Sequence, residues 1–207
     1  EVGPDDEVIT TPFTFVATIE AITYLGAKPV FADIDLPTYN IDPKSIAAKI
    51  TPQTKAILPV HLYGYPADME PIMQLAQKHN LKVVEDCAQA IGTRYRGKHV
   101  GSFGHAGAFS FFPTKNMGAM GDGGMVIVQA KAVADELRVL RGHGSRQPYY
   151  YDVIGYNSRL DEIQAAILRV KLKYISRWNQ QRRANAELYA QHLKGLPLTL
   201  PPHAAEH

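Results

Sequence analysis

Short apolar runs rich in β-branched residues alternate with longer segments of mixed polarity along most of this chain. The apolar runs predict strands over residues 7–10, 29–34, 56–62, 81–85, 106–112 and 125–129. The segments between them predict helices over 15–25, 43–50 and 69–79, and further helices over 130–142 and from Ser158 onward. Strands joined by helices indicate an α/β fold, with a mostly parallel sheet covered by helices on both faces.

The ends of several predicted helices carry recognisable signals. Gly26 closes the first helix, and Asp42 caps the second, which has proline at its first position. Ser158 and Asp161 resemble a capping box, with aspartate in place of the usual glutamate or glutamine, at the start of a helix long enough to link two domains. The segment 143–156, with three consecutive tyrosines, is predicted to be a long loop of the kind that often serves binding.

The stretch after the strand predicted over 106–112 favours a reactive lysine. Pro113 cannot extend a central strand, so the chain must turn there, and Lys115 follows two residues later. The glycines at 118, 121, 123 and 124 permit positive φ angles and close approach of the backbone. Lys115 is therefore predicted at a strand's end, able to reach a buried ligand; the alternative is a solvated lysine in a surface turn.

A second polar group ends the strand predicted over 81–85. Asp86 falls where this strand runs out, and open α/β sheets bind ligands at the carboxyl ends of their strands. The aspartate either caps a following helix or directs a charge at a ligand. With Lys115 and the amide of Gln89 it matches the needs of pyridoxal phosphate (PLP). These are an amine for a Schiff base, a carboxylate that keeps the ring nitrogen protonated, and a hydrogen bond at the phenolic oxygen.

The composition is that of an ordinary enzyme domain. The 22 Lys and Arg residues nearly balance the 20 Asp and Glu residues, so neither a nucleic acid nor a membrane is indicated as a partner. No apolar run approaches the roughly 18 residues of a membrane helix, and no signal-peptide pattern opens the chain. The single cysteine, Cys87, is predicted to be small buried filler, and it favours a reducing, cytoplasmic compartment because no disulfide can form within the chain.

The eight histidines do not indicate a metal site. They show neither the i, i+4 spacing nor the neighbouring cysteines of a zinc site, so no metal is predicted. His61 ends an apolar strand and could lie near the cofactor pocket.

Five blocks of sequence in this order resemble the DegT/DnrJ/EryC1/StrS family of PLP-dependent sugar aminotransferases, which are fold type I enzymes. The blocks cover nearly the whole chain: 11–18 (TPFTFVAT), 59–64 (PVHLYG), 85–90 (EDCAQA), 109–116 (FSFFPTKN) with 121–124 (GDGG), and 155–166 (GYNSRLDEIQAA). Any one block would be weak evidence, whereas five in order are a strong signal. The resemblance implies that the α/β fold is the large cofactor-binding domain of these enzymes.

The resemblance also implies a role for each matching residue. Lys115 would form the Schiff base, Asp86 would pair with the pyridinium nitrogen, and Gln89 would bond the phenolic oxygen. Ser110 would bond the phosphate. Phe15 would stack on the cofactor's face, unless it is a core residue of the helix that begins near it.

A sixth matching residue, Asn157, bears on how the subunits assemble. Asn157 matches a position that reaches the cofactor phosphate of the neighbouring protomer, so the resemblance implies a homodimer with shared active sites. The alternative is a turn asparagine before a helix N-cap at Ser158.

The implied activity is amino transfer from an amino acid, glutamate by resemblance, to a nucleotide-linked keto-deoxysugar, in synthesis of amino sugars for surface polysaccharide or secondary metabolites. The 155–166 block and the tyrosine-rich loop look most like members that act on 3-keto sugars. Two alternatives remain open. One is a family member that performs dehydration or acts in regulation, although Lys115 argues against a dehydratase. The other is a non-catalytic α/β domain that holds a phosphate ligand through backbone amides.

The family's members are longer than 207 residues, so the chain is interpreted as a fragment, incomplete at both ends. Residues 1–175 are expected to form part of the large PLP-binding domain. Residues 176–207 are expected to form a linker helix and the start of a small C-terminal domain. A glycine-threonine turn that should hold much of the cofactor phosphate would precede Glu1.

Overall fold

The computed structural model describes residues 2–202 and is built on a six-stranded sheet. The strands lie in the order β2-β1-β3-β4-β7-β8, and all neighbours are parallel except β7 and β8. Their bounds are β1 Glu7–Thr10, β2 Lys28–Phe31, β3 Thr54–Ile57, β4 Lys82–Asp86, β7 Ala106–Ser110 and β8 Gly124–Val128. The predicted α/β fold with a mostly parallel sheet is confirmed.

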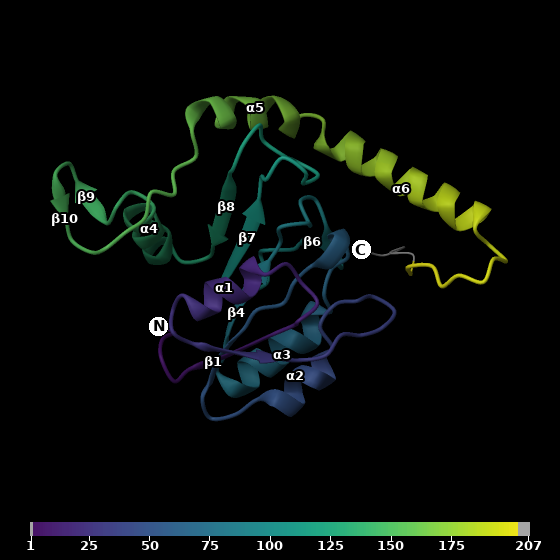
Figure 1. Ribbon diagram of the computed structural model, residues 1–207, viewed down its shortest axis with the longest axis horizontal. Coiled ribbons are helices and arrows are strands. Elements are labelled where there is room, and N and C mark those ends of the chain that lie inside the picture. The colour runs from purple at the N-terminus through teal and green to yellow at the C-terminus, as the bar shows by residue number, and fades with distance from the viewer. Residues whose placement is uncertain (1, 203–207) are drawn as a thin grey trace.

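Helices cover both faces of this sheet. Helices α2 (Pro43–Lys49) and α3 (Met69–His79) lie against each other on one face, and α1 (Ala17–Thr23) lies on the other (Figure 1). Side chains of β1 alternate accordingly, since Ile9 packs in the core cluster that contains α2 and α3, whereas Val8 packs with Ile22 of α1. The connections explain this arrangement, because α1 leads towards one edge of the sheet and α2 and α3 lead towards the other, and right-handed crossovers then fall on opposite faces.

The observed bounds of the helices and strands agree in part with those predicted from the sequence. The carboxylate of Asp42 accepts a hydrogen bond from the Lys44 amide at 2.9 Å, so the predicted cap of α2 is confirmed, and α3 has the predicted bounds. Helix α1 is shorter than the predicted 15–25. The strand predicted over 56–62 is Thr54–Ile57, followed by a 3₁₀ turn over Leu62–Gly64. The hairpin of β5 (Arg94–Tyr95) and β6 (Lys98–His99) was not predicted.

The helix predicted from Ser158 begins later, at Glu162, and Asp161 occupies the N-cap position without a side-chain capping bond. The proposed capping box is therefore wrong. Backbone pairing explains the difference, because Asn157 pairs with Gly142 and the Ser158 amide donates to the Arg141 carbonyl at 2.9 Å. These contacts hold residues 157 and 158 against the end of α4 (Lys131–Leu140).

The C-terminal part of the described chain consists of two helices rather than one. Helix α5 (Glu162–Leu172) lies across the end of β7 and β8, and α6 (Ile175–His192) extends away from the sheet (Figure 1). The segment 143–156, predicted as a loop, contains a two-stranded hairpin, β9 (Ser145–Gln147) with β10 (Tyr150–Tyr151). Over residues 2–202, no helix combines the length and apolar character needed to cross a membrane.

Candidate active site

The side chain of Asp86 ends β4 and is held by two hydrogen bonds. Its Oδ2 accepts from the hydroxyl of Thr18 at 2.8 Å, and its Oδ1 accepts from the Ala88 amide at 3.0 Å. The residue is half-buried. No helix follows it, since residues 87–93 form turns, so the interpretation as a helix N-cap is wrong. Each carboxylate oxygen has one protein donor and keeps capacity for another, which suits a fixed carboxylate directed at a ligand.

Glu85 precedes Asp86 but lies in a different environment. Its side chain is fully buried and accepts four hydrogen bonds, at 3.0 Å from His61 Nε2, 2.6 Å from Gly101 N, 2.8 Å from Phe103 N and 2.7 Å from Gly104 N. Burial by itself raises the pKa of Glu85, but the hydrogen bonds from His61, Gly104 and Gly101 outweigh it and hold the pKa below its ordinary value. Glu85 is thus a structural carboxylate.

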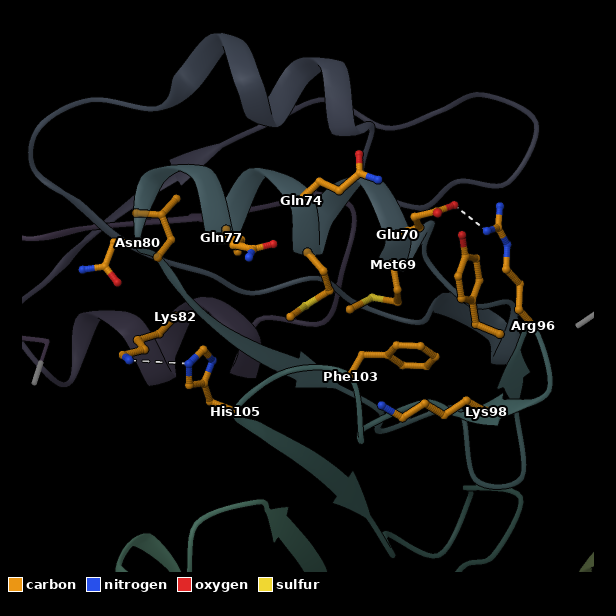
Figure 2. Close-up of a pocket in the computed structure, with 14 residues that line it drawn as sticks. Met69, Glu70, Gln74, Gln77, Asn80, Lys82, Arg96, Lys98, Phe103 and His105 are labelled. Carbon is orange, nitrogen blue, oxygen red and sulfur yellow. Dashed lines mark hydrogen bonds and ion pairs between the residues drawn. The ribbon is translucent and has the colours of Figure 1, made fainter.

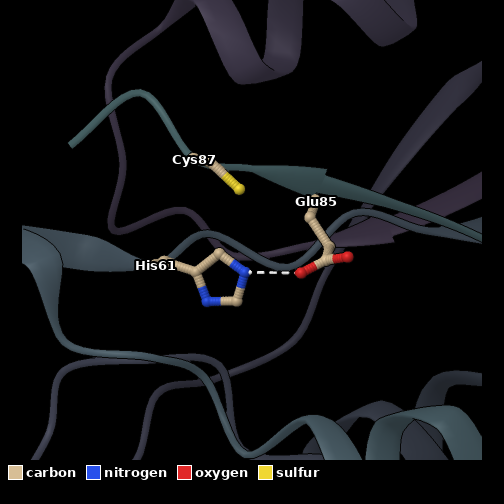
Figure 3. A group of neighbouring side chains, drawn as sticks. All are labelled: His61, Glu85 and Cys87. Carbon is tan, nitrogen blue, oxygen red and sulfur yellow. Dashed lines mark hydrogen bonds and ion pairs between the residues drawn. The ribbon is translucent and has the colours of Figure 1, made fainter. Parts of the chain in front are cut away.

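His61, Glu85 and Cys87 form a buried group whose possible ligand atoms lie within 4.8 Å of one another (Figure 3). The lone pairs of His61 and Glu85 are already engaged. His61 Nδ1 accepts from the Ala67 amide at 3.0 Å, so its proton sits on Nε2 and is donated to Glu85. Burial and the charges of Glu85 and Asp86 raise the pKa of the Cys87 thiol, which disfavours the thiolate that a metal would need. The group stabilises the packing of the strands and turns that carry it. Both ring nitrogens of His61 are used in hydrogen bonds, one to Glu85 and one to the Ala67 amide.

Lys115 lies in the tight turn that follows β7. Its amide donates to Phe112 O at 2.9 Å, and its carbonyl accepts from Gly118 N at 2.9 Å. The side chain is half-buried, and Nζ has no hydrogen bond or ion pair within the described residues. Lys115 is thus neither fully exposed nor engaged by another described residue, and its amine is available to a ligand or to solvent.

Glycine at 118 is required by space rather than by backbone angle. A Cβ there would lie 2.2 Å from the Pro113 carbonyl oxygen. None of the four glycines of this loop has a positive φ, so the loop does not use that freedom, whereas the expected close approach of backbone is confirmed at Gly118 and Gly124. Helix α5 supports the loop, because Lys171 donates to Gly118 O and Gln164 Oε1 accepts from Met120 N at 2.8 Å.

The orientation of the Gln89 amide is fixed by a turn in unusual backbone geometry. Its Oε1 accepts from the Tyr63 amide at 2.7 Å, and Tyr63 holds a left-handed conformation with φ 56° and ψ 17°. Because the oxygen is used in this way, the Nε2 donor of Gln89 remains for another partner. Tyr63 was not singled out from the sequence, although it lies in the 59–64 block that carries the family resemblance.

The other three predicted residues differ in their exposure and in their hydrogen-bond partners. Ser110 ends β7 beside β8, and its hydroxyl accepts from the Phe112 amide at 3.2 Å. Phe15 precedes α1 and is 70% exposed, so the alternative of a helix core residue is wrong. Asn157 is exposed, and its Oδ1 accepts from Arg159 Nε at 3.3 Å. Among the described residues, Asn157 has no hydrogen bond to any other predicted site residue.

A cavity of about 760 Å³ lies along α3 (Figure 2). Its walls include Met69, Met73 and Phe103, and its rim carries basic side chains such as Lys82 and Lys98. None of the predicted site residues lines it. This cavity is separate from the edge where Asp86 and Ser110 stand.

The donor set fits PLP. Lys115 offers an unpaired amine, and Asp86 offers a carboxylate with fixed orientation. Gln89 offers an amide donor, and Phe15 an exposed aromatic face.

A comparison with known families matches residues 1–207 to the DegT/DnrJ/EryC1/StrS aminotransferase family. The chain belongs to this family. The sequence did not single out Thr18, because its partner Asp86 is remote in sequence. It also did not single out the structural residue Glu85, although strand alternation could have placed that side chain in the core.

Named relatives of this DegT/DnrJ/EryC1/StrS chain include enzymes and a regulator. UDP-N-acetyl-3-dehydro-alpha-D-glucosamine 3-aminotransferase of Acidithiobacillus ferrooxidans is 59% identical over 201 residues, which are 97% of this chain and 54% of that protein. The pleiotropic regulatory protein of Geobacillus stearothermophilus is 58% identical over 193 residues, which are 93% of this chain and 52% of that protein.

Solved structures agree with the fold. S. venezuelae DesV in complex with a ketimine intermediate has a TM-score of 0.95 at 47% identity, over 99% of this chain and 56% of that one. NtdA from Bacillus subtilis with bound cofactor PMP has a TM-score of 0.92 at 35% identity, over 99% of this chain and 48% of that one. The prediction of a fold type I aminotransferase large domain is confirmed. The chain spans about half the length of the relatives it matches.

Proposed function

We propose that this chain carries the cofactor site of a PLP-dependent aminotransferase, which moves an amino group from an amino acid to a nucleotide-linked keto-deoxysugar. The observation that carries the proposal is the relation of Asp86 to Lys115. Strands β4 and β7 are paired neighbours, Asp86 ends the first, and Lys115 stands in the turn beyond the second. The family membership and the aminotransferase names of relatives support the same reaction.

The roles proposed for the polar residues follow from their geometry. Bound PLP would supply an electron sink that holds the amino group between the two half-reactions. Lys115 would be the attachment point and, once the amino donor has displaced it, would carry a proton to and from the donor's α-carbon. Asp86 would hold a proton on the ring nitrogen. Its carboxylate is already oriented for this task by Thr18 and Ala88.

Three further residues would position the ring and its phosphate. Gln89 would donate from Nε2 to the phenolic oxygen, because its Oε1 is engaged by the Tyr63 amide. Phe15, with 70% of its surface exposed, would cover the ring face. Ser110 would bond the phosphate from the end of β7.

The proposed acceptor is a 3-keto sugar linked to a nucleotide, and the proposed donor is glutamate. The name of the A. ferrooxidans relative, which specifies a 3-dehydro sugar, supports the ring position. The amino sugar formed would serve a surface polysaccharide or a secondary metabolite. A cytoplasmic location remains a prediction from the single cysteine.

A homodimer with shared sites is part of the proposal. Asn157 is exposed and is held beside α4 by the bridge to Gly142. The preceding hairpin and its flanks expose large apolar side chains, among them Tyr149 at 90% and Ile154 at 96%. Such a surface is typical of an interface, and a partner subunit would place Asn157 at its neighbour's cofactor phosphate.

A regulatory role is the second candidate, and the name of the G. stearothermophilus relative favours it. The retained Lys115 and the hydrogen bonds that orient Asp86 favour catalysis instead, because amino transfer needs both the amine and an oriented carboxylate. A dehydratase is disfavoured because Lys115 is retained. A non-catalytic phosphate-binding domain would not need a lysine amine and an oriented carboxylate after neighbouring strands.

The experiment that tests the proposal uses the full-length protein. The protein is incubated with PLP, glutamate and a panel of nucleotide-linked 3-keto and 4-keto sugars, and amino sugar formation is followed. The proposal expects turnover with a 3-keto acceptor and none after Lys115→Ala. PLP binding without turnover on any acceptor would favour the regulatory candidate, and absence of PLP binding would overturn the cofactor assignment.

A further inference from the structure

Two threonine hydroxyls form a chain that ends on the carboxylate of Asp86. Thr18 Oγ1 lies 2.8 Å from Asp86 Oδ2, and Thr14 Oγ1 lies 2.9 Å from Thr18 Oγ1. Thr18 belongs to α1, 68 residues away from Asp86 in sequence. The chain therefore joins the segment before α1 to the end of β4.

The direction of both hydrogen bonds can be deduced. An ionised carboxylate only accepts, so the single hydroxyl proton of Thr18 is donated to Asp86. Thr18 must then accept from Thr14, whose hydroxyl is the donor of the second bond. Aligned hydroxyls polarise one another, and Thr18 is only 5% exposed, so water does not compete strongly for the bond.

The same segment carries Phe15. The Thr18 amide donates to the Phe15 carbonyl at 3.2 Å, which closes the turn that leads into α1. The ring of Phe15 remains exposed, whereas the hydroxyls on either side of it, at positions 14 and 18, are directed to one another and to Asp86. The position of the aromatic ring and that of the carboxylate are thus coupled through Thr18.

We infer that Thr18 is a positioning residue, which holds the Asp86 carboxylate and the Phe15 ring in a fixed relation, so that the first would meet the ring nitrogen and the second would cover the face of a flat cationic heteroaromatic ring. The inference rests on the proposed function, because that function supplies the ring. In this role Thr18 would act through Asp86 and not on the ring itself. Its hydroxyl keeps Oδ2 in place, as the Ala88 amide keeps Oδ1 in place.

The test compares Thr18→Val with Thr18→Ser in the full-length protein. Valine has the shape of threonine without the hydroxyl, and serine keeps the hydroxyl without the methyl group. Hydrogen bonds to charged groups are among the stronger ones, so Thr18→Val is expected to weaken PLP affinity and to lower kcat, each by about tenfold, with little change in the KM for the sugar. Thr18→Ser is expected to stay within about threefold of the wild type. PLP affinity is measured by absorbance titration, independently of turnover.

Thr23→Val is the matched control, because Thr23 is exposed on the same helix and donates only to the Glu20 carbonyl. It should leave both readouts unchanged. If Thr18→Val disrupts folding, Thr14→Val replaces it, since Thr14 reaches Asp86 only through Thr18; about threefold losses are then expected.

The outcomes separate this inference from the proposed function. If the wild type binds no PLP, the proposed function fails and the inference fails with it. If the wild type binds PLP and Thr18→Val matches it, the positioning role alone is overturned. Equal losses in Thr18→Val and Thr18→Ser would also overturn it, because packing at the position, and not the hydroxyl, would then be responsible.

Discussion

Glu85 and Asp86 are consecutive residues of β4, and their carboxylates serve different parts of the protein. Glu85 is fully buried and bonded to His61 at 3.0 Å, whereas Asp86 is half-buried and bonded to Thr18 of α1 at 2.8 Å. Strand alternation sends neighbouring side chains to opposite faces, which explains the separation. One acid stabilises the fold, and the other is available to a ligand.

Replacement of Asp86 by asparagine should remove most of the activity. A neutral amide cannot hold a ring nitrogen protonated, and the loss is expected to be about 3 kcal/mol or more in kcat/KM, comparable to other lost transition-state electrostatics. Steady-state kinetics of Asp86→Asn in the full-length protein measure this loss. Asp5→Asn, at an exposed position, is the control, and a mutant that keeps over half of the wild-type rate would refute the assignment.

Replacement of Glu85 by glutamine should act on stability. An amide offers one acceptor oxygen where the carboxylate receives four donors, so buried donors lose their partners. The expected loss is about 3 kcal/mol in the free energy of unfolding at pH 7, measured by urea denaturation. Glu187→Gln on the exposed surface of α6 should change little.

The difference in unfolding free energy between the wild type and Glu85→Gln should become smaller as the pH falls. Because the pKa of Glu85 is lowered in the folded protein, its contribution is fully present above the unfolded pKa of about 4.3 and is lost as the pH falls through the folded pKa. The gap between the wild type and Glu85→Gln should therefore narrow below about pH 4. A constant gap from pH 7 to pH 3 would contradict the role assigned to Glu85.

Alanine at position 118 should displace the turn that carries Lys115. The added Cβ would lie 2.2 Å from the Pro113 carbonyl oxygen, too close for the backbone to remain in place. We expect PLP affinity to fall by about tenfold or more, measured by absorbance titration. Gly3→Ala is the control, since nothing lies within 4 Å of the place that its methyl group would take. Unchanged affinity in Gly118→Ala would show that the turn tolerates the shift.

Mixing two inactive variants tests the shared site. In a heterodimer of Lys115→Ala and Asn157→Ala protomers, one site would carry both lesions and the other neither, so activity should reappear after subunit exchange. Native mass spectrometry verifies that heterodimers form. Inactive heterodimers would show that Asn157 does not belong to a shared site. A fully active monomer would show that no dimer is needed for activity.

The sequence predicted the order of the main strands and helices because each follows a local pattern of apolar residues. It also predicted that Asp86 and Lys115 each follow a strand, and the structure shows that these two strands, β4 and β7, are paired neighbours. It did not predict the start of α5. There, backbone pairing of Asn157 with Gly142 outweighs the capping signal at Ser158.

Contacts between remote residues account for most of what the sequence left out. The bond from Thr18 to Asp86 spans 68 residues, and the bonds of Glu85 to the 101–104 turn depend on backbone amides that carry no sequence signal. The orientation of Gln89 depends on the left-handed backbone of Tyr63, an uncommon geometry for tyrosine. Local patterns thus locate the candidates Asp86 and Lys115, and tertiary contacts set the orientation of Asp86 and Gln89.

The most direct test of the central claim identifies the lysine that holds the cofactor. The full-length protein is incubated with PLP, reduced with borohydride, digested and mapped by mass spectrometry. The account predicts a single pyridoxyl group, on the peptide that contains Lys115, and its absence from Lys115→Ala, while Lys49→Ala, at an exposed position of α2, keeps it. A pyridoxyl group on another lysine, or on none, would contradict the account.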